Sequence, residues 1–235
     1  MFESFLSCSR SDAACGHALA GSARQVVSAR SVRGLWSVGR ERRRKAGIDD
    51  ATRRVLLGFV APLWIVAGLA DWWCHRRSDI EHTAGTRESA VHALMMSEAS
   101  VPTLLGLFFE VNAGLLAVTL GALGLHQATA VYDVAYAEGR REVTATEQHV
   151  HGLLEQVPVM ATAFLFALHW DQARTLVGAG PDRPRFGLEP KRRPLSRRTK
   201  ASLLTAIAAF GAAPYAEELA RCRRAARRRG LSSRP

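Results

Sequence analysis

Two pairs of residues in this sequence combine a carboxylate with an imidazole at helical spacing. Glu88 and His92 lie four residues apart, and Glu147 and His151 repeat that spacing. Side chains four residues apart project from one face of an α-helix, so each pair would present two metal-competent groups together. Glu155, four residues beyond His151, extends the second pair into a longer stripe. Because imidazole and carboxylate ligands together suit Zn, Mn or non-haem Fe, the two stripes predict a metal site.

Further histidines and acids have spacings that would align them with these stripes. His75 and His82 lie seven residues apart, which is close to two helical turns, and His126 and Asp133 have the same separation. A dinuclear site in a helical bundle takes about six ligands from several helices, so we expect the stripes to converge on one site, with a di-iron centre as the candidate. The predicted metal ligands are His75, His82, Glu88, His92, His126, Asp133, Glu147, His151 and Glu155.

The same pairs have a second interpretation. Carboxylate di-iron proteins use Glu-x-x-His, whereas both pairs here read Glu-x-x-x-His. The chain also has no grouped His-x-x-His-His box of the kind found in membrane desaturases and hydroxylases. A Glu-x-x-x-His pair is also typical of the solvated face of an amphipathic helix. In that interpretation the histidines lie at a membrane interface and bind no metal.

Apolar runs are the elements that must position these groups. Residues 55–73 have about the length of a bilayer-spanning helix and end on the aromatic pair Trp72 and Trp73, as membrane helices often do at the interface. We therefore predict an all-α, multi-pass membrane bundle of three or four spans, with short amphipathic interfacial helices near residues 86–100 and 146–156. The predicted spans are residues 55–73, 101–125, 157–170 extended back to 150, and, as the shortest candidate, 201–213.

A glutamate interrupts the second apolar run. Glu110 lies near the middle of residues 101–125, where a carboxylate is costly unless it faces the bundle interior and finds a partner or a proton. Glu110 is therefore the predicted catalytic residue, acting as a proton relay; the alternative is a protonated carboxyl bonded to a neighbouring helix. A continuous span here would place the two stripes on opposite sides of the membrane. Convergence then requires either that the chain folds back or that the bundle projects far enough from the bilayer to bring the two stripes together.

Charge and cysteine content narrow the partners. The net charge is +11 and comes mainly from arginine, which favours anionic membrane lipid as a partner; no nucleic-acid fold is recognisable, so nucleic acid is not expected. The four cysteines include no Cys-x-x-Cys pair, so a zinc ribbon is not indicated. We predict a disordered basic N-terminal tail (1–50), a membrane helical bundle (51–220) and a basic C-terminal tail (221–235). The sequence makes no prediction about oligomeric state.

Several motifs carry a resemblance. They include Asp-Trp-Trp-Cys-His-Arg-Arg at 71–77, Glu-Gln-His-Val-His at 147–151 and Pro-Tyr-Ala-Glu-Glu-Leu-Ala-Arg-Cys at 214–222. Over about residues 54–224 the chain resembles a family of small, uncharacterised bacterial multi-pass membrane proteins. The resemblance supports a membrane protein, with a bacterial inner membrane as the expected location. It brings no established activity.

Two functions are open from the sequence. One is an integral membrane protein with a His/carboxylate metal site, acting as a non-haem metal oxidoreductase on a lipid-phase substrate, with Fe, Zn or Mn as the metal. The other is a non-catalytic membrane scaffold or sensor that binds anionic lipid or a partner protein. The sequence does not decide whether the protein is an enzyme, because motifs for nucleotide binding, serine hydrolases and zinc proteases are absent.

Overall fold

The computed structural model describes residues 44–232, and every regular element among them is a helix. Four of these helices are long and apolar enough to cross a membrane, which confirms the predicted all-α, multi-pass bundle. Residues 1–43 of the predicted N-terminal tail lie outside the described residues. The four long helices are Arg44–Arg77, whose later part is α2 (Ala61–Arg77), α3 (Gly85–Phe108), α4 (Ala113–Glu138) and α5 (Ala145–Leu168).

The remaining helices follow the four long ones. The short α6 (Trp170–Thr175) comes directly after α5, and α7 (Arg197–Ala206) leads through the π-helical segment Ile207–Ala212 into α8 (Ala213–Ser232). Residues 201–213 therefore lie in the continuous helical stretch from α7 to α8. This stretch is not among the four candidate spans of the described chain. The C-terminal segment predicted as a tail is helical as far as Ser232.

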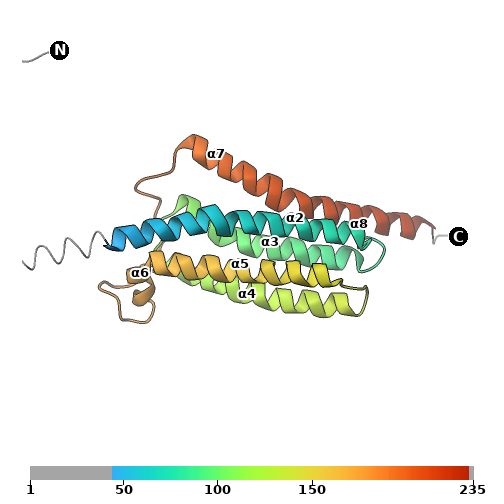
Figure 1. The fold of residues 1–235 in the computed structure, drawn as a ribbon, viewed down its shortest axis with the longest axis horizontal. Helices are drawn as coiled ribbons and strands as arrows, with labels where there is room; N and C mark the ends of the chain where they lie inside the picture. The colour runs from blue at the N-terminus through green and yellow to red at the C-terminus, as the bar shows by residue number, and fades with distance from the viewer. Residues whose placement is uncertain (1–43, 233–235) are drawn as a thin grey trace, which may run out of the picture. The chain divides into compact units, whose positions relative to one another are not determined.

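The long helices lie side by side, and α8 runs along them (Figure 1). Helix α3 packs against α4 and α8, and α2 packs against α5. Short connections at residues 78–84, 109–112 and 139–144 make successive helices antiparallel. We call the end that carries connections 78–84 and 139–144 the site end, and the end that carries connection 109–112 the far end.

The structure corrects the prediction of one span over residues 101–125. Helix α3 ends at Phe108, Phe109 has an extended backbone, and α4 begins at Ala113. Asn112 caps α4, because its side-chain oxygen accepts a hydrogen bond from the Leu115 amide at 3.1 Å. The polar residues that seemed to interrupt a span therefore form a helix turn. As a result, both Glu-x-x-x-His pairs lie at the site end.

The predicted relay Glu110 lies at the far end, in this turn. Its Oε1 accepts a hydrogen bond from the Arg192 amide at 2.8 Å, and its own amide donates to the Glu189 carbonyl at 2.8 Å. Gly114 leaves room for the linker between α6 and α7 (residues 176–196), since a Cβ there would lie 2.5 Å from the Phe186 carbonyl oxygen. Glu110 thus fastens the linker to the α3–α4 turn and does not approach the predicted ligands.

The interfacial helices predicted at residues 86–100 and 146–156 are not separate elements. They are the first parts of α3 and α5, which continue through Pro102 and Pro158. Proline is tolerated in membrane helices because neighbouring groups satisfy the freed carbonyl. Each Glu-x-x-x-His pair is therefore held on a long, continuous helix and not on a short surface segment.

Apolar side chains cover the outside of the long helices. Leu57, Phe59, Val66 and Val131 are each more than half exposed. A soluble protein rarely leaves so many large apolar side chains uncovered, whereas lipid is a suitable neighbour for them. At the site end of α2, Arg76 and Arg77 stack over the Trp72 and Trp73 rings at 4.9 and 5.0 Å, as expected where a span meets the headgroups.

Candidate metal centre

Three histidines from three helices meet inside the site end. His75 of α2 stacks on His92 of α3, with ring centroids 4.4 Å apart and planes within 9° of parallel. The His151 ring of α5 lies 6.0 Å from His75 at a steep angle. The two predicted stripes therefore lie in one cluster around His75, which is fully buried.

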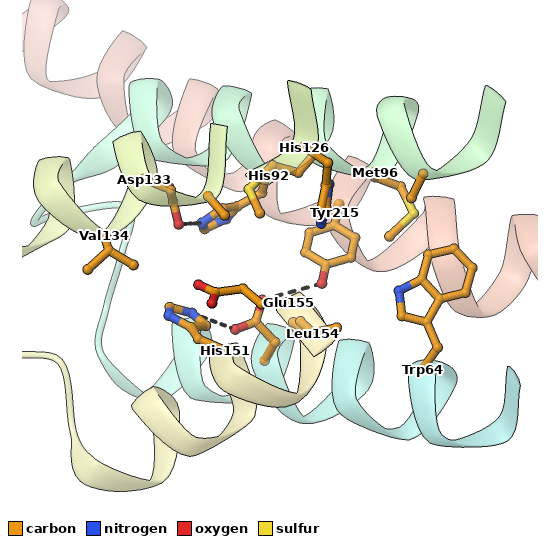
Figure 2. A pocket seen from close by; sticks show the side chains of 14 residues that line it. Trp64, His92, Met96, His126, Asp133, Val134, His151, Leu154, Glu155 and Tyr215 are labelled. Atoms are coloured by element: carbon orange, nitrogen blue, oxygen red, sulfur yellow. Dashed lines mark hydrogen bonds and ion pairs between the residues drawn. The ribbon is translucent and has the colours of Figure 1, made fainter. Parts of the chain in front are cut away.

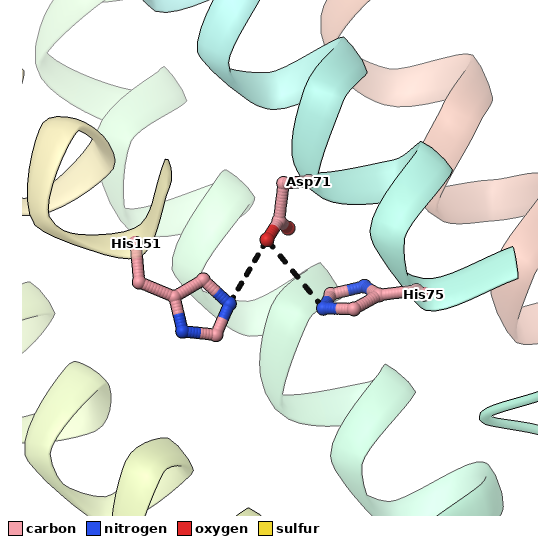
Figure 3. Close-up of side chains that lie close together, drawn as sticks. All are labelled: Asp71, His75 and His151. Atoms are coloured by element: carbon pink, nitrogen blue, oxygen red, sulfur yellow. Dashed lines mark ion pairs between the residues drawn. The ribbon is translucent and has the colours of Figure 1, made fainter. Parts of the chain in front are cut away.

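Carboxylates surround the Nε2 atom of His75. Asp71 Oδ1 lies 3.5 Å and Glu147 Oε1 3.3 Å from this nitrogen, and His151 Nε2 lies 2.9 Å from the same Asp71 oxygen (Figure 3). Asp71 and His75 are four residues apart, as are Glu147 and His151, so α2 and α5 each contribute one carboxylate and one imidazole from a single face. We call Asp71, His75, Glu147 and His151 the first half-site.

A second group of carboxylates surrounds the Nε2 atom of His92. Asp133 Oδ2 of α4 lies 3.3 Å and Glu88 Oε1 of α3 lies 3.9 Å from this nitrogen. All three side chains are buried. We call Glu88, His92 and Asp133 the second half-site. The two half-sites together draw side chains from all four long helices.

Glu218 of α8 fixes the orientation of both stacked rings. Its Oε2 lies 2.8 Å from His75 Nδ1 and its Oε1 lies 2.9 Å from His92 Nδ1. Burial by itself would raise the pKa of Glu218, but the hydrogen bonds from both rings outweigh it and lower the pKa to about 2. An ionised carboxylate only accepts, so both Nδ1 atoms carry the proton. The Nε2 atoms of both rings therefore face the carboxylates of the half-sites, and each would have to lose any proton it carries there before it could bind a metal.

Several buried polar atoms at the centre of the cluster, some of them in close ion-pair contacts, have no well-aligned hydrogen bond to any of residues 44–232. These atoms include Asp71 Oδ1, His75 Nε2 and Asp133 Oδ1. Buried polar groups are nearly always hydrogen-bonded, so such a set needs an explanation. Two ligands about 2.1 Å from one metal ion lie about 3.0–3.4 Å apart, at right or tetrahedral angles. Three separations within the first half-site, at 2.9–3.5 Å, are compatible with a shared ion, whereas His151 Nε2 and Glu147 Oε1 lie further apart, at 3.9 Å.

The cluster contains more negative than positive charge. Arg141 is the buried cation, with Nη2 2.5 Å from Glu88 Oε1 and 2.6 Å from Glu147 Oε1. Burial alone would lower the Arg141 pKa, but hydrogen bonds to Glu88 and Glu147 raise it. If the imidazoles are neutral, as metal ligands must be, four net negative charges remain, whereas each protonated ring would offset one of them; unbalanced buried charge is very costly. Two divalent cations would balance them. The carboxylates counted are Asp71, Glu88, Asp133, Glu147 and Glu218.

Tyr215 closes the cluster on the side of α8. Its hydroxyl donates to Asp71 Oδ2 at 3.3 Å, and its ring meets the His92 ring edge-on at 6.2 Å. Tyr215, Asp71, Arg141 and Glu218 are absent from the predicted ligand set. Asp71 had a signal that could have found it, because it precedes His75 by four residues and so forms a third carboxylate–histidine pair.

Not every predicted ligand joins the half-sites. His82 is exposed, and its Nδ1 lies 2.9 Å from Asp79 in the connection after α2. His126 is also buried, but it lies on α4 seven residues before Asp133 and so further from the site end. Its Nδ1 lies 3.6 Å from Glu98 Oε2. Glu155 borders the same pocket as His126. Glu110 lies at the far end and cannot contribute.

A small pocket of about 50 Å³ adjoins the half-sites (Figure 2). One wall presents His92, Asp133, His151 and Tyr215. The other walls are mainly apolar and come from residues further toward the middle of the long helices. The pocket therefore extends from the half-sites into the bundle, away from the site end. The apolar lining residues include Trp64, Met95, Met96, Ala99, Ala130 and Leu154.

Comparisons of the chain with models of protein families, with curated proteins and with solved structures find no match. A functional assignment therefore has to come from the geometry of the half-sites and the pocket.

Proposed function

We propose that the two half-sites bind two divalent metal ions and that the protein is a non-haem metal oxidoreductase acting on a lipid-phase substrate. The observation that carries the proposal is the pair of hydrogen bonds from His75 and His92 to Glu218. Metal-binding histidines commonly donate their second ring N–H to a carboxylate, which fixes the tautomer and strengthens the ligand. Here one carboxylate serves two histidines, so the two metal-facing nitrogens belong to neighbouring sites.

The donor set favours iron. Three imidazoles and four carboxylates from four helices match the mixed nitrogen and oxygen environment of non-haem iron, and a helical bundle is a usual frame for such pairs. Manganese suits the same ligands. Zinc in a structural site is more often held by four ligands that include cysteine, and Cys74 does not belong to any of the candidate metal-ligand groups among the described residues.

The location of the pocket supports a substrate from the lipid phase. Its apolar walls lie within helices long enough to cross a membrane, and it ends on His92, Asp133 and His151. A volume of about 50 Å³ has room for one or two molecules of the size of water. When bound, iron would supply redox chemistry with dioxygen as the oxidant and an external donor of two electrons. The protein would hold the metals, exclude bulk water and admit an apolar group.

Iron loading tests the proposal. Full-length protein in lipid nanodiscs, given two equivalents of ⁵⁷Fe(II) without oxygen and then exposed to air, should show the Mössbauer spectrum of an exchange-coupled pair. Mass spectrometry of membrane lipids from expressing cells should show oxidised species that are missing with the His92→Ala variant. Iron present only as isolated paramagnetic ions would contradict the dinuclear site.

The scaffold or sensor alternative keeps one observation in its favour. Arg141 already neutralises Glu88 and Glu147, as a purely structural ion network would require. Unchanged lipids, together with less than about a tenth of an equivalent of Fe, Mn and Zn per chain, would favour this alternative, because a functional site is expected to be filled.

A further inference from the structure

A second pocket lies outside the half-sites, between the connection at residues 78–84 and helix α8. It has a volume of about 380 Å³. Four of its lining residues are arginines, whereas Glu81 is the one acid that lines it. The lining residues are Glu81, His82, Arg221, Arg224, Ala225, Arg228 and Arg229.

Contacts with Glu81 hold two of the arginines in place. Arg221 forms an ion pair with the Glu81 carboxylate, and Arg229 Nη2 donates to the Glu81 carbonyl at 2.8 Å. Even so, Nε and Nη2 of Arg221 are buried without a hydrogen bond. Burial lowers the pKa of Arg221, and the nearby Arg76 and Arg224 add to that effect. The pocket is therefore preformed and has an excess of positive charge.

Two more arginines complete the wall. Arg224 and Arg228 lie one turn apart on α8, and neither has a carboxylate within ion-pair distance among residues 44–232. Guanidinium groups match the oxygen geometry of phosphate, and several of them can share a doubly charged group. We propose that this pocket binds the phosphate monoester headgroup of an anionic membrane lipid.

The depth of the pocket supports a lipid source over a free anion. It lies at the site end, where Trp72 and Trp73 stack with Arg76 and Arg77. Aromatic residues of this kind gather at the level of the headgroups, so a phospholipid beside the bundle would present its phosphate at that level. The chain also offers an internal control, because Arg223 and Arg227 lie on α8 but do not line the pocket.

Binding of dioctanoyl phosphatidic acid to the full-length protein in phosphatidylcholine nanodiscs tests the proposal. The variant Arg224→Gln/Arg228→Gln should raise the dissociation constant by about tenfold or more, since it removes two guanidinium contacts. The control Arg223→Gln/Arg227→Gln loses the same charge from the same helix and should change it by less than about twofold. Glutamine keeps helix propensity, and circular dichroism checks that both variants are folded.

Inorganic phosphate and dioctanoyl phosphatidylcholine identify the source of the phosphate. Both should compete only at much higher concentrations than phosphatidic acid. Inorganic phosphate that competes equally well would assign the pocket to a free anion and overturn the lipid source. An equal loss of affinity in the pocket and control variants would show that only the overall charge of α8 matters, and would overturn the pocket itself.

Discussion

Histidine and carboxylate ligand atoms lie within 4.8 Å of one another in three sets of described side chains at the site end. Two sets share His75 and together form a buried group, and the third, Asp79, Glu81 and His82, forms a mostly exposed group. In the exposed group, His82 bonds to Asp79 and Glu81 pairs with Arg221. In the buried group, Asp71 Oδ1 and His75 Nε2 have no hydrogen bond. Both groups satisfy a distance criterion, yet only the buried one has donor atoms that face each other without another partner.

The difference shows which observations support a metal site more strongly than proximity does. Water solvates and screens exposed charges, so His82 and Asp79 need no ion to be stable. Water does not reach the buried group to the same degree, and its excess negative charge has to be balanced within the protein. Burial, missing hydrogen bonds and the histidine orientation fixed by Glu218 together point to metal, whereas proximity alone does not.

Removal of the shared histidine should break the buried group most severely. His75 is a ligand of the first half-site, stacks on His92 of the second and lies within ligand distance of both Asp71 and Glu88, so His75→Ala should reduce bound metal from about two equivalents to below about 0.2. The matched substitution His82→Ala should leave metal content unchanged, because His82 lies in the exposed group. Metal analysis after chelator dialysis measures both. Equal losses in the two variants would remove the distinction between the groups.

Arg141 should be the next most sensitive position. Arg141→Met leaves Glu88 and Glu147 without their buried cation, so the metal-free protein should lose about 3–5 kcal/mol of stability. Arg140→Met removes an exposed neighbour and should cost less than about 1 kcal/mol. Thermal unfolding of metal-free and metal-loaded protein makes the comparison. If added metal fails to recover any of the lost stability, the two glutamates are not ligands.

Glu218→Gln should have a moderate effect on metal affinity. Glutamine has an NH2 donor in place of one carboxylate oxygen, so either His75 Nδ1 or His92 Nδ1 should meet a donor, and that ring should lose its orientation. Such substitutions near metal ligands typically cost about 10–100-fold in affinity. Glu217→Gln, one residue away, should cost less than about twofold because Glu217 contacts Trp72 and Arg76 at the surface. Chelator competition distinguishes the two, and identical affinities would refute the role of Glu218.

The smallest effect is expected at the far end. Glu110→Gln keeps a side-chain oxygen that can accept from the Arg192 amide, so stability should change by less than about 1 kcal/mol and metal affinity should not change. Metal titration of this variant compares the two ends of the bundle. A loss of metal affinity there would restore Glu110 to the site, contrary to its position in the α3–α4 turn.

The sequence allowed the helices and much of the cluster to be predicted for a physical reason. The length of an apolar run indicates whether a helix could cross a membrane, and a spacing of four residues indicates which side chains share a helix face. Both signals are local. The four-residue spacing correctly placed Glu88 with His92 and Glu147 with His151 on shared helix faces, whereas apolar length gave the wrong bounds for the helices that carry them. Because the prediction depended only on local spacing, it placed these pairs on their helices but did not show which other residues they meet.

The remaining features depend on information that is not local. Residues 101–125 have the hydropathy of one span, and only the cap formed by Asn112 shows that the chain turns there. Glu218 lies 143 residues from His75, and nothing in its neighbourhood indicates that α8 docks on α3. Arg141 lies in the turn between α4 and α5, and nothing in the local sequence indicates that its side chain reaches back into the cluster.

The metal content of wild-type protein tests the central claim most directly. Full-length protein purified in mild detergent without chelators, and then reconstituted with Fe(II) or Mn(II) and desalted, should retain about two equivalents per chain, one for each half-site. Retention of less than about a tenth of an equivalent, with His92→Ala and His151→Ala indistinguishable from wild type, would contradict a metal centre. That result would mean that the buried charged side chains form a purely structural network of ion pairs.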